Sequence, residues 1–104
     1  MNEVCTGRVV ISRAGHDKGD AFIVMEILAD GQLILCDGKR RTLQKPKRKK
    51  RMHVFVTPAR WEELGLRLST KEQLLDSDIR KALAALGYAN RPEEEGYIVE
   101  TGRY

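Results

Sequence analysis

A loop of nine residues, Ser12 to Asp20 (SRAGHDKGD), lies between two apolar runs and contains two glycines, one histidine, two aspartates and two basic residues. His16, Asp17 and Asp20 are of the types that bind metal ions, but three such residues on one turn are weak grounds for a metal site. A catalytic centre would need a nucleophile beside His16, and no neighbouring residue is suitably placed. Metal and catalytic chemistry are therefore both disfavoured here.

Nucleotide-binding patterns do not fit this loop either. A phosphate-binding loop has the form GxxxxGK[ST] before a helix, whereas here Lys18 precedes Gly19 and a strand-like run follows. Gly15 and Gly19 also do not fit the GxGxxG fingerprint, and no βαβ pattern follows. We expect no cofactor and no enzymatic activity. Two interpretations stay open, a plain polar turn or a loop that binds a polyanion.

The residue types favour contact with a polyanion. Gly15 and Gly19 allow the backbone to turn tightly and to approach a phosphate or a base closely. Arg13 and Lys18 add positive charge, and His16 is expected at the tip of the loop, where its ring can donate to a phosphate or stack on a base.

Positive charge is concentrated in a second segment, Lys39 to Arg51 (KRRTLQKPKRKKR). The segment holds nine basic residues and no acidic one, in a chain with 19 Lys and Arg against 15 Asp and Glu. The rest of the chain therefore has ten basic and fifteen acidic residues, a net charge of −5. Such a strip is typical of proteins that bind a polyanion. The alternative is a solvated basic linker, which the strand-like segments on either side disfavour.

Length and composition limit the class of protein. At 104 residues the chain fits one domain with a modest core. No apolar run is long enough to span a membrane, and the first residues lack the pattern of a secretory signal, so we expect a cytoplasmic protein with no membrane partner. Cys5 and Cys36 lack CxxC spacing, so we expect both to be reduced and neither to bind metal.

The first half of the chain predicts short β-strands. Residues 6–12 (TGRVVIS) alternate, and residues 21–28 (AFIVMEIL) are apolar on both faces, as in a strand buried in a small closed barrel. Asp30-Gly31 predicts a type I′ hairpin turn, and Asp37-Gly38 predicts a second turn. Further strands are expected at 32–36 (QLILC), 39–44 (KRRTLQ) and 53–57 (HVFVT). Five strands in a meander favour a small barrel.

The second half predicts helices. Residues 57–65 (TPARWEELG) fit a short helix with Thr57 as its N-cap, Pro58 at its first position and Gly65 at its end.

A second helical segment covers residues 69–87. Ser69 with Glu72 forms a capping-box pattern, while Asp76 can begin a separate helix. An apolar stripe follows, formed by Leu75, Ile79, Ala82, Leu83 and Leu86, and Gly87 can end the helix. We expect this helix to pack on the barrel. The predicted organisation is a barrel at 1–57, a helical appendage at 58–88 and an acidic tail at 89–104 with a possible short strand at 97–100 (YIVE).

Two segments carry a resemblance to a known family. Residues 7–28 (GRVVISRAGHDKGDAFIVMEIL) resemble a KOW motif, a β–loop–β element around a G-x-x-K-G loop, here Gly15 to Gly19. Residues 37–54 (DGKRRTLQKPKRKKRMHV) resemble small bacterial KOW-domain RNA-binding proteins related to a large-subunit ribosomal protein of archaea and eukaryotes. In that group an Asp-Gly-Lys-x-Arg turn precedes a Pro-Lys-Arg-Lys run and a histidine that opens the last strand. The matching residues are Asp37, Gly38, Lys39, Arg41, Pro46, Lys47, Arg48, Lys49 and His53, and residues 78–87 (DIRKALAALG) resemble the C-terminal helix of many members.

The resemblance implies a mainly β fold, a small five-stranded SH3-like (KOW) barrel with one or two C-terminal helices. It also implies an RNA-binding protein of translation, ribosomal-protein-like or ribosome-associated. We expect the protein to be cytoplasmic and a monomer when free. Its partners would be ribosomal RNA and, through the ribosome, ribosomal proteins. The RNA-binding residues expected from the loop and the basic strip are Arg13, Gly15, His16, Lys18, Gly19, Lys39, Arg40, Arg41, Lys45, Lys47, Arg48, Lys49, Lys50, Arg51 and His53. Two alternatives stay open: a KOW-type protein-interaction module of the transcription or translation machinery, and a non-specific nucleic-acid binder.

Overall fold

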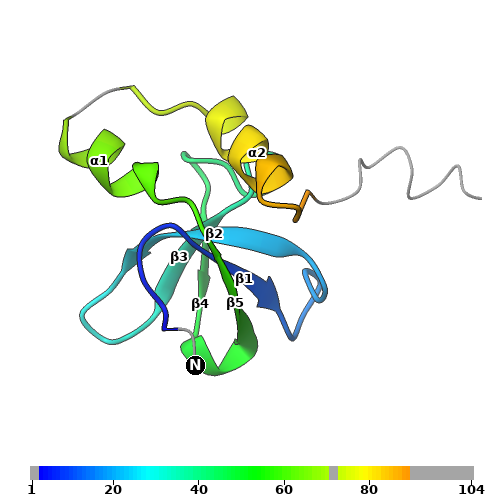
Figure 1. Ribbon diagram of the computed structural model, residues 1–104. Helices are drawn as coiled ribbons and strands as arrows, with labels where there is room; N and C mark the ends of the chain where they lie inside the picture. The colour runs from blue at the N-terminus through cyan, green and yellow to red at the C-terminus, as the bar shows by residue number, and fades with distance from the viewer. Residues whose placement is uncertain (1–2, 71–72, 90–104) are drawn as a thin grey trace, which may run out of the picture.

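The computed structural model describes residues 3–70 and 73–89 (Figure 1). Its strands are β1 (Arg8–Ser12), β2 (Ala21–Ile27), β3 (Leu33–Cys36), β4 (Lys47–Lys49) and β5 (Val54–Arg60). A 3-10 turn, η1 (Arg51–His53), precedes β5, and two helices follow it, α1 (Glu63–Ser69) and α2 (Asp76–Ala85). In the described ranges, no helix has the length and apolar character needed to cross a membrane.

The five strands form one antiparallel sheet in the order β4-β3-β2-β1-β5. In the register, Val10 pairs with Phe22 on β2 and Ile11 pairs with Phe55 on β5. Among the described residues no strand pairing joins the edge strands β4 and β5, so the sheet is open at the level of its backbone ladders. The fold is thus mainly β with two helices, as expected.

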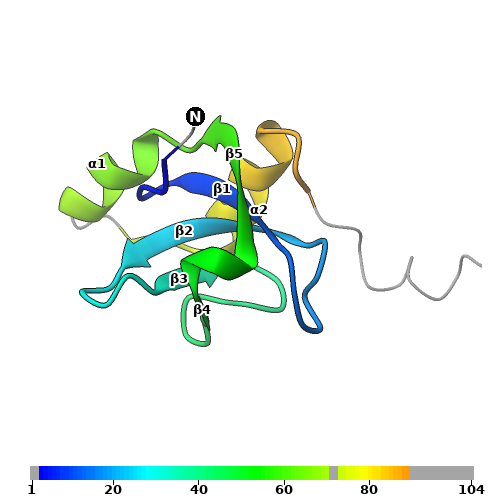
Figure 2. The same ribbon diagram turned by 90° about the horizontal axis from the view of Figure 1, so that it is seen from below.

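The sheet buries apolar side chains on both faces. One core lies between the sheet and the helices, where Val9 and Ile23 pack with Leu64 of α1 and Leu83 of α2. Figure 2 shows both helices on the same side of the sheet. The second core lies on the opposite face and consists of Val10, Phe22, Val24, Leu33, Leu35 and Val54. The continuous apolar character of the first part of β2 follows from this arrangement, because residues 21–24 are buried and contribute to both cores, whereas Glu26 and Ile27 are exposed.

Helix α2 packs on the sheet as the apolar stripe predicts. Ile79, Ala82 and Leu83 are buried, and Leu86 packs against the same cluster. Leu75 departs from the prediction: it is 48% exposed, because it precedes the first turn of the helix.

The first hairpin turn differs in type from the prediction. The amide of Gly31 donates to the carbonyl of Leu28 (2.8 Å), so the tight turn is centred on Ala29 and Asp30. Gly31 follows it with φ +89°. This is the arrangement of a three-residue hairpin loop rather than of a two-residue type I′ turn.

The fourth strand was predicted in the wrong place. Residues 39–44 form a loop, and the strand lies at Lys47–Lys49. One carboxylate oxygen of Asp37 accepts hydrogen bonds from the amides of Lys39 and Arg41, both at 2.9 Å. The chain is therefore folded around Asp37, and these amides are not free to pair with a strand.

The helix predicted at 57–65 is also wrong in its position. β5 continues to Arg60, and the Thr57 hydroxyl donates to the Val9 carbonyl (2.8 Å) rather than capping a helix. Pro58 is compatible with this because β5 is an edge strand, where a missing N–H can face solvent. α1 begins only at Glu63 and contains Gly65 in its interior.

The remaining predictions of secondary structure concern residues at or beyond the ends of the described ranges. Ser69 ends α1, and its hydroxyl donates to the Leu66 carbonyl. Glu72, its expected partner in a capping box, lies outside the described residues, as do the acidic tail from residue 90 and the strand predicted at 97–100.

Candidate nucleic-acid interface

The β1–β2 loop is held in a compact shape by its own backbone. The amide of Gly19 donates to the carbonyl of Ser12, and the amide of Ser12 donates to the carbonyl of Asp20, both at 2.9 Å. Gly15 and Gly19 adopt φ values of +80° and +90°, which side chains other than glycine rarely tolerate. Glycine at these two positions is therefore required by the shape of the loop.

Asp17 joins this loop to the basic strip. Its side chain is buried, and its Oδ2 lies 3.1 Å from Nη2 of Arg41 and 3.6 Å from Nζ of Lys47. A carboxylate buried in this way is stabilised by the cations around it. Two segments that are far apart in the sequence are thus fixed against each other through one aspartate.

Lys49 makes a second link. It is only 8% exposed, and its Nζ donates to the carbonyl of Ala14 (2.9 Å). Side chains therefore bridge β4 and the β1–β2 loop. Backbone hydrogen bonds do not pair β4 with β5, the two edge strands of the sheet.

Helix α2 fixes the other end of the basic strip. Arg80 donates to the Gly38 carbonyl (2.6 Å), and the Asp76 carboxylate accepts from the Leu43 amide (2.8 Å). Gly38 has φ +82°, and a Cβ at this position would collide with the Asp76 carbonyl oxygen.

The Cys36 thiol is buried beneath the same loop and donates to the Thr42 carbonyl (3.4 Å). Burial, with Asp76 and Asp37 nearby, raises the pKa of that thiol to about 12.

The expected RNA-binding residues fall into two groups by exposure. Arg41 and Lys47 are half-buried against Asp17, and Lys49 is buried against Ala14. The exposed ones are Arg13, Gly15, His16, Lys18, Gly19, Lys39, Arg40, Lys45, Arg48, Lys50 and Arg51, while His53 is half-buried. Nη1 of Arg40 lies 3.9 Å from Oδ2 of Asp20. Inside the described ranges, the side chains of Lys39, Lys45, Arg48 and Lys50 hold no hydrogen bond or ion pair.

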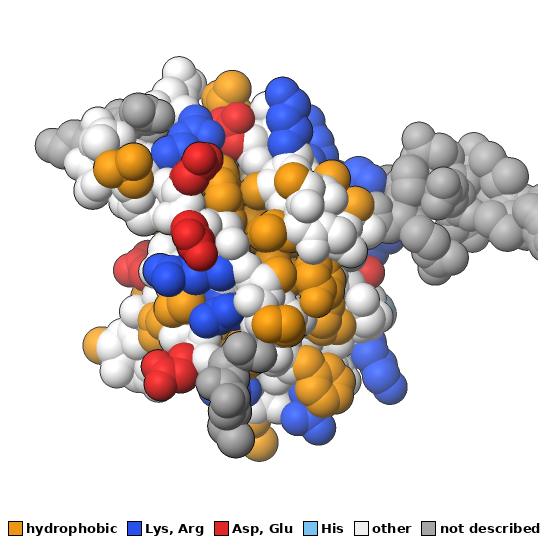
Figure 3. All heavy atoms as spheres, viewed as in Figure 1, with side chains coloured by type: hydrophobic (Ala, Val, Ile, Leu, Met, Phe, Trp, Pro, Cys, Tyr) orange, Lys and Arg blue, Asp and Glu red, His pale blue; other side chains and the backbone are white. Residues whose placement is uncertain are grey.

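We call residues 13–20 and 37–53 together the cationic belt. The belt contains eleven Lys and Arg residues against three Asp residues, a net charge of +8. Lys and Arg side chains are visible at the lower right of the space-filling view in Figure 3, on the side of the molecule where the β1–β2 loop lies in Figure 1. A surface with an excess of positive charge attracts polyanions and accelerates their association.

An aromatic residue beside the belt was missed from the sequence. Phe55 is 56% exposed, and the guanidinium carbon of Arg13 lies 4.5 Å from the centre of its ring. The alternation of Val54, Phe55 and Val56 on β5 is the signal that could have revealed it, because it turns Phe55 away from the core in which both valines pack.

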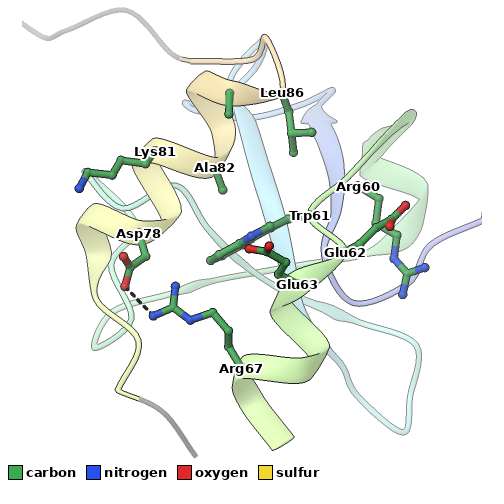
Figure 4. Close-up of a pocket in the computed structure, with 10 residues that line it drawn as sticks. Arg60, Trp61, Glu62, Glu63, Arg67, Asp78, Lys81, Ala82 and Leu86 are labelled. Atoms are coloured by element: carbon green, nitrogen blue, oxygen red, sulfur yellow. Dashed lines mark hydrogen bonds and ion pairs between the residues drawn. The ribbon is translucent and has the colours of Figure 1, made fainter. Parts of the chain in front are cut away.

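Two larger hollows lie on the described surface, one away from the cationic belt and one at its edge. A groove of about 500 Å³ runs between α1 and α2, with the Trp61 indole across it and the ion pair of Arg67 with Asp78 at one side (Figure 4). A second, of about 460 Å³, lies beside the β2–β3 hairpin and is lined by Lys50, Arg51 and Met52 among others. Across residues 3–70 and 73–89, no three His, Cys, Asp or Glu side chains are grouped so that they could hold a metal ion.

No protein-family model matches this chain, and no curated protein matches it in sequence.

Proposed function

We propose that this protein is an RNA-binding protein, ribosomal-protein-like or ribosome-associated, that binds structured ribosomal RNA in the cytoplasm through the cationic belt. The observation that carries the proposal is the joining of the β1–β2 loop and the basic strip into one surface by Asp17, which contacts Arg41 and Lys47. A solvated linker would not be fixed by a buried carboxylate. This arrangement favours a preformed binding surface over either a plain polar turn or a loose basic tract.

The proposed mechanism separates positioning from contact. The β1–β2 loop is held against β4 by Arg41, Lys47 and Lys49. The other cations of the belt are therefore kept at fixed distances from one another. The exposed cations then neutralise phosphates and release counterions. The compact Gly15–Gly19 loop presents backbone amides and His16 to sugar and base edges, which is how folded RNA is largely recognised.

The proposed domain type is an SH3-like barrel of the KOW class. Its support is the second core, enclosed on the face away from the helices, together with the bridge from Lys49 to Ala14. These side-chain contacts take the place of the backbone hydrogen bonds that would join the edge strands in a fully closed barrel.

The experiment compares two sets of variants in titrations of ribosomal RNA. Lys39, Lys45, Arg48 and Lys50 are replaced together by glutamine, since none of the four is tied to another described residue by its side chain. We expect a thermal melt close to that of the wild type and a loss of tight RNA binding. Wild-type affinity in this variant would refute the proposal.

A matched pair of single substitutions controls for net charge. Lys45→Gln and Lys81→Gln each remove one exposed cation, but Lys81 lies on α2 in the groove away from the belt. We expect Lys45→Gln to weaken RNA binding and to reduce the salt slope by about one, and Lys81→Gln to leave both unchanged. Equal effects would indicate attraction by net charge alone, the non-specific alternative.

A protein-interaction module is the second candidate function. The groove between α1 and α2 favours it, because Trp61 lies in the groove and Leu66 and Leu68 are exposed on α1. Its lining mixes Arg60, Arg67 and Lys81 with Glu62, Glu63 and Asp78, so it carries no net charge for a polyanion. Sedimentation with ribosomes that persists in high salt and is lost in the Leu66→Ser variant would favour this candidate.

A further inference from the structure

Phe55 is an exposed aromatic residue whose position the fold does not require. Its neighbour Val54 is 1% exposed and packs in the core, whereas Phe55 is 56% exposed. The strand pairing of Phe55 with Ile11 is made by backbone groups, so the aromatic ring contributes little to it. A large apolar side chain exposed beside a charged surface indicates a contact with a partner.

Arg13 is fixed next to this ring. Its amide donates to the His53 carbonyl (2.8 Å), and its guanidinium lies over the Phe55 ring at 4.5 Å. A guanidinium stacked on an aromatic ring is a flat, cationic surface of the kind on which nucleobases stack. Because Arg13 also begins the β1–β2 loop, this surface is continuous with the cationic belt.

We propose that the Arg13–Phe55 pair is a stacking site for one unpaired nucleobase of the bound RNA. The inference rests on the proposed function and adds what the charge of the belt cannot supply, a preference for RNA with an unstacked base over a continuous duplex. The base packs against the pair while the phosphates on either side of that nucleotide contact cations of the belt. A paired base in a duplex keeps its faces inside the helical stack and cannot occupy the site.

The test uses two RNAs of equal length and composition, a hairpin with an unpaired loop and a fully paired duplex. Stacking of a base on an aromatic side chain is worth about 1–3 kcal/mol. We therefore expect Phe55→Leu to weaken hairpin binding about tenfold and duplex binding less than twofold. Phe55→Tyr, which keeps the ring, should bind as the wild type does, and Arg13→Lys, which keeps the charge but not the plane, should weaken the hairpin selectively.

A control and a spectroscopic measurement complete the experiment. Leu66→Ala removes an apolar side chain of α1 that is 65% exposed, against 56% for Phe55, and should change neither affinity. A 2-aminopurine in the hairpin loop should be quenched by the wild type and by Phe55→Tyr, but not by Phe55→Leu. Equal loss of hairpin and duplex binding in Phe55→Leu, or no loss of either, would overturn the stacking site. If the wild type binds neither RNA, it is the proposed function that fails.

Discussion

Replacing Asp17 by asparagine should destabilise the protein, because this carboxylate holds the β1–β2 loop to the basic strip. The change keeps the size of the side chain and removes its charge. Hydrogen bonds to charged groups contribute about 1.5–3 kcal/mol, and breaking a fully buried ion pair costs about 3–5 kcal/mol. The Asp17 side chain is only 4% exposed, but those of Arg41 and Lys47 are both 32% exposed, so water replaces part of what they lose. We therefore expect a loss of about 2 kcal/mol in the free energy of unfolding.

Urea unfolding followed by circular dichroism measures this loss directly. Asp30→Asn is the matched control, since Asp30 is exposed and, among the described residues, its side chain bonds only to Gln32 in its own hairpin. We expect this change to cost less than about 0.5 kcal/mol. A double-mutant cycle with Arg41→Gln should give a coupling of at least about 0.5 kcal/mol between Asp17 and Arg41. A loss in Asp17→Asn no larger than in the control would refute the view that Asp17 organises the belt.

Three further predictions concern α2 and the loop beneath it. Gly38→Ala should lower the unfolding free energy by more than about 1 kcal/mol in urea titrations, because φ is +82° and the new Cβ meets the Asp76 carbonyl. Cys36 should react with a thiol reagent at pH 8 only on unfolding, whereas half-exposed Cys5 reacts in the folded protein. The reason is that a pKa of about 12 leaves Cys36 with about a thousandfold less thiolate than the ordinary value of 9.0 would. Asp78→Asn should lower the melting temperature more at pH 7 than at pH 2. The Leu75 amide, with Arg67, lowers the pKa of Asp78, so its stabilisation is present above its ordinary pKa and is lost as pH falls through the lowered one.

The strands β1, β2 and β3 could be predicted because they alternate or are continuously apolar, and burial imposes those patterns. The fourth strand could not, since Lys47, Arg48 and Lys49 have no apolar period. What decides its position is the folding of residues 38–43 around Asp37 and the contacts of that loop with α2, which lies more than 30 residues further along the chain. Pro58 was misleading for a different reason: proline suits both the first turn of a helix and an edge strand.

The residue types of the candidate site could be predicted from the sequence, but not which of its cations hold the site together and which are exposed. The charge of the basic strip is evident from the sequence, and so is the need for glycine at Gly19. The sequence cannot tell which cations face inward, because Asp17 meets Arg41 across 24 residues and Lys49 meets Ala14 across 35. Phe55 was missed because its exposure depends on which face of β5 the core covers.

The salt dependence of RNA binding tests the central claim, that the exposed cations of the belt bind the phosphates of structured RNA. If about five phosphates are contacted, the logarithm of the association constant should fall against the logarithm of salt with a slope of about −3.5 to −4.5. Removal of Lys39, Lys45, Arg48 and Lys50 should reduce the magnitude of that slope by about 3. A wild-type slope near zero, or a slope that these four substitutions leave unchanged, would contradict the account.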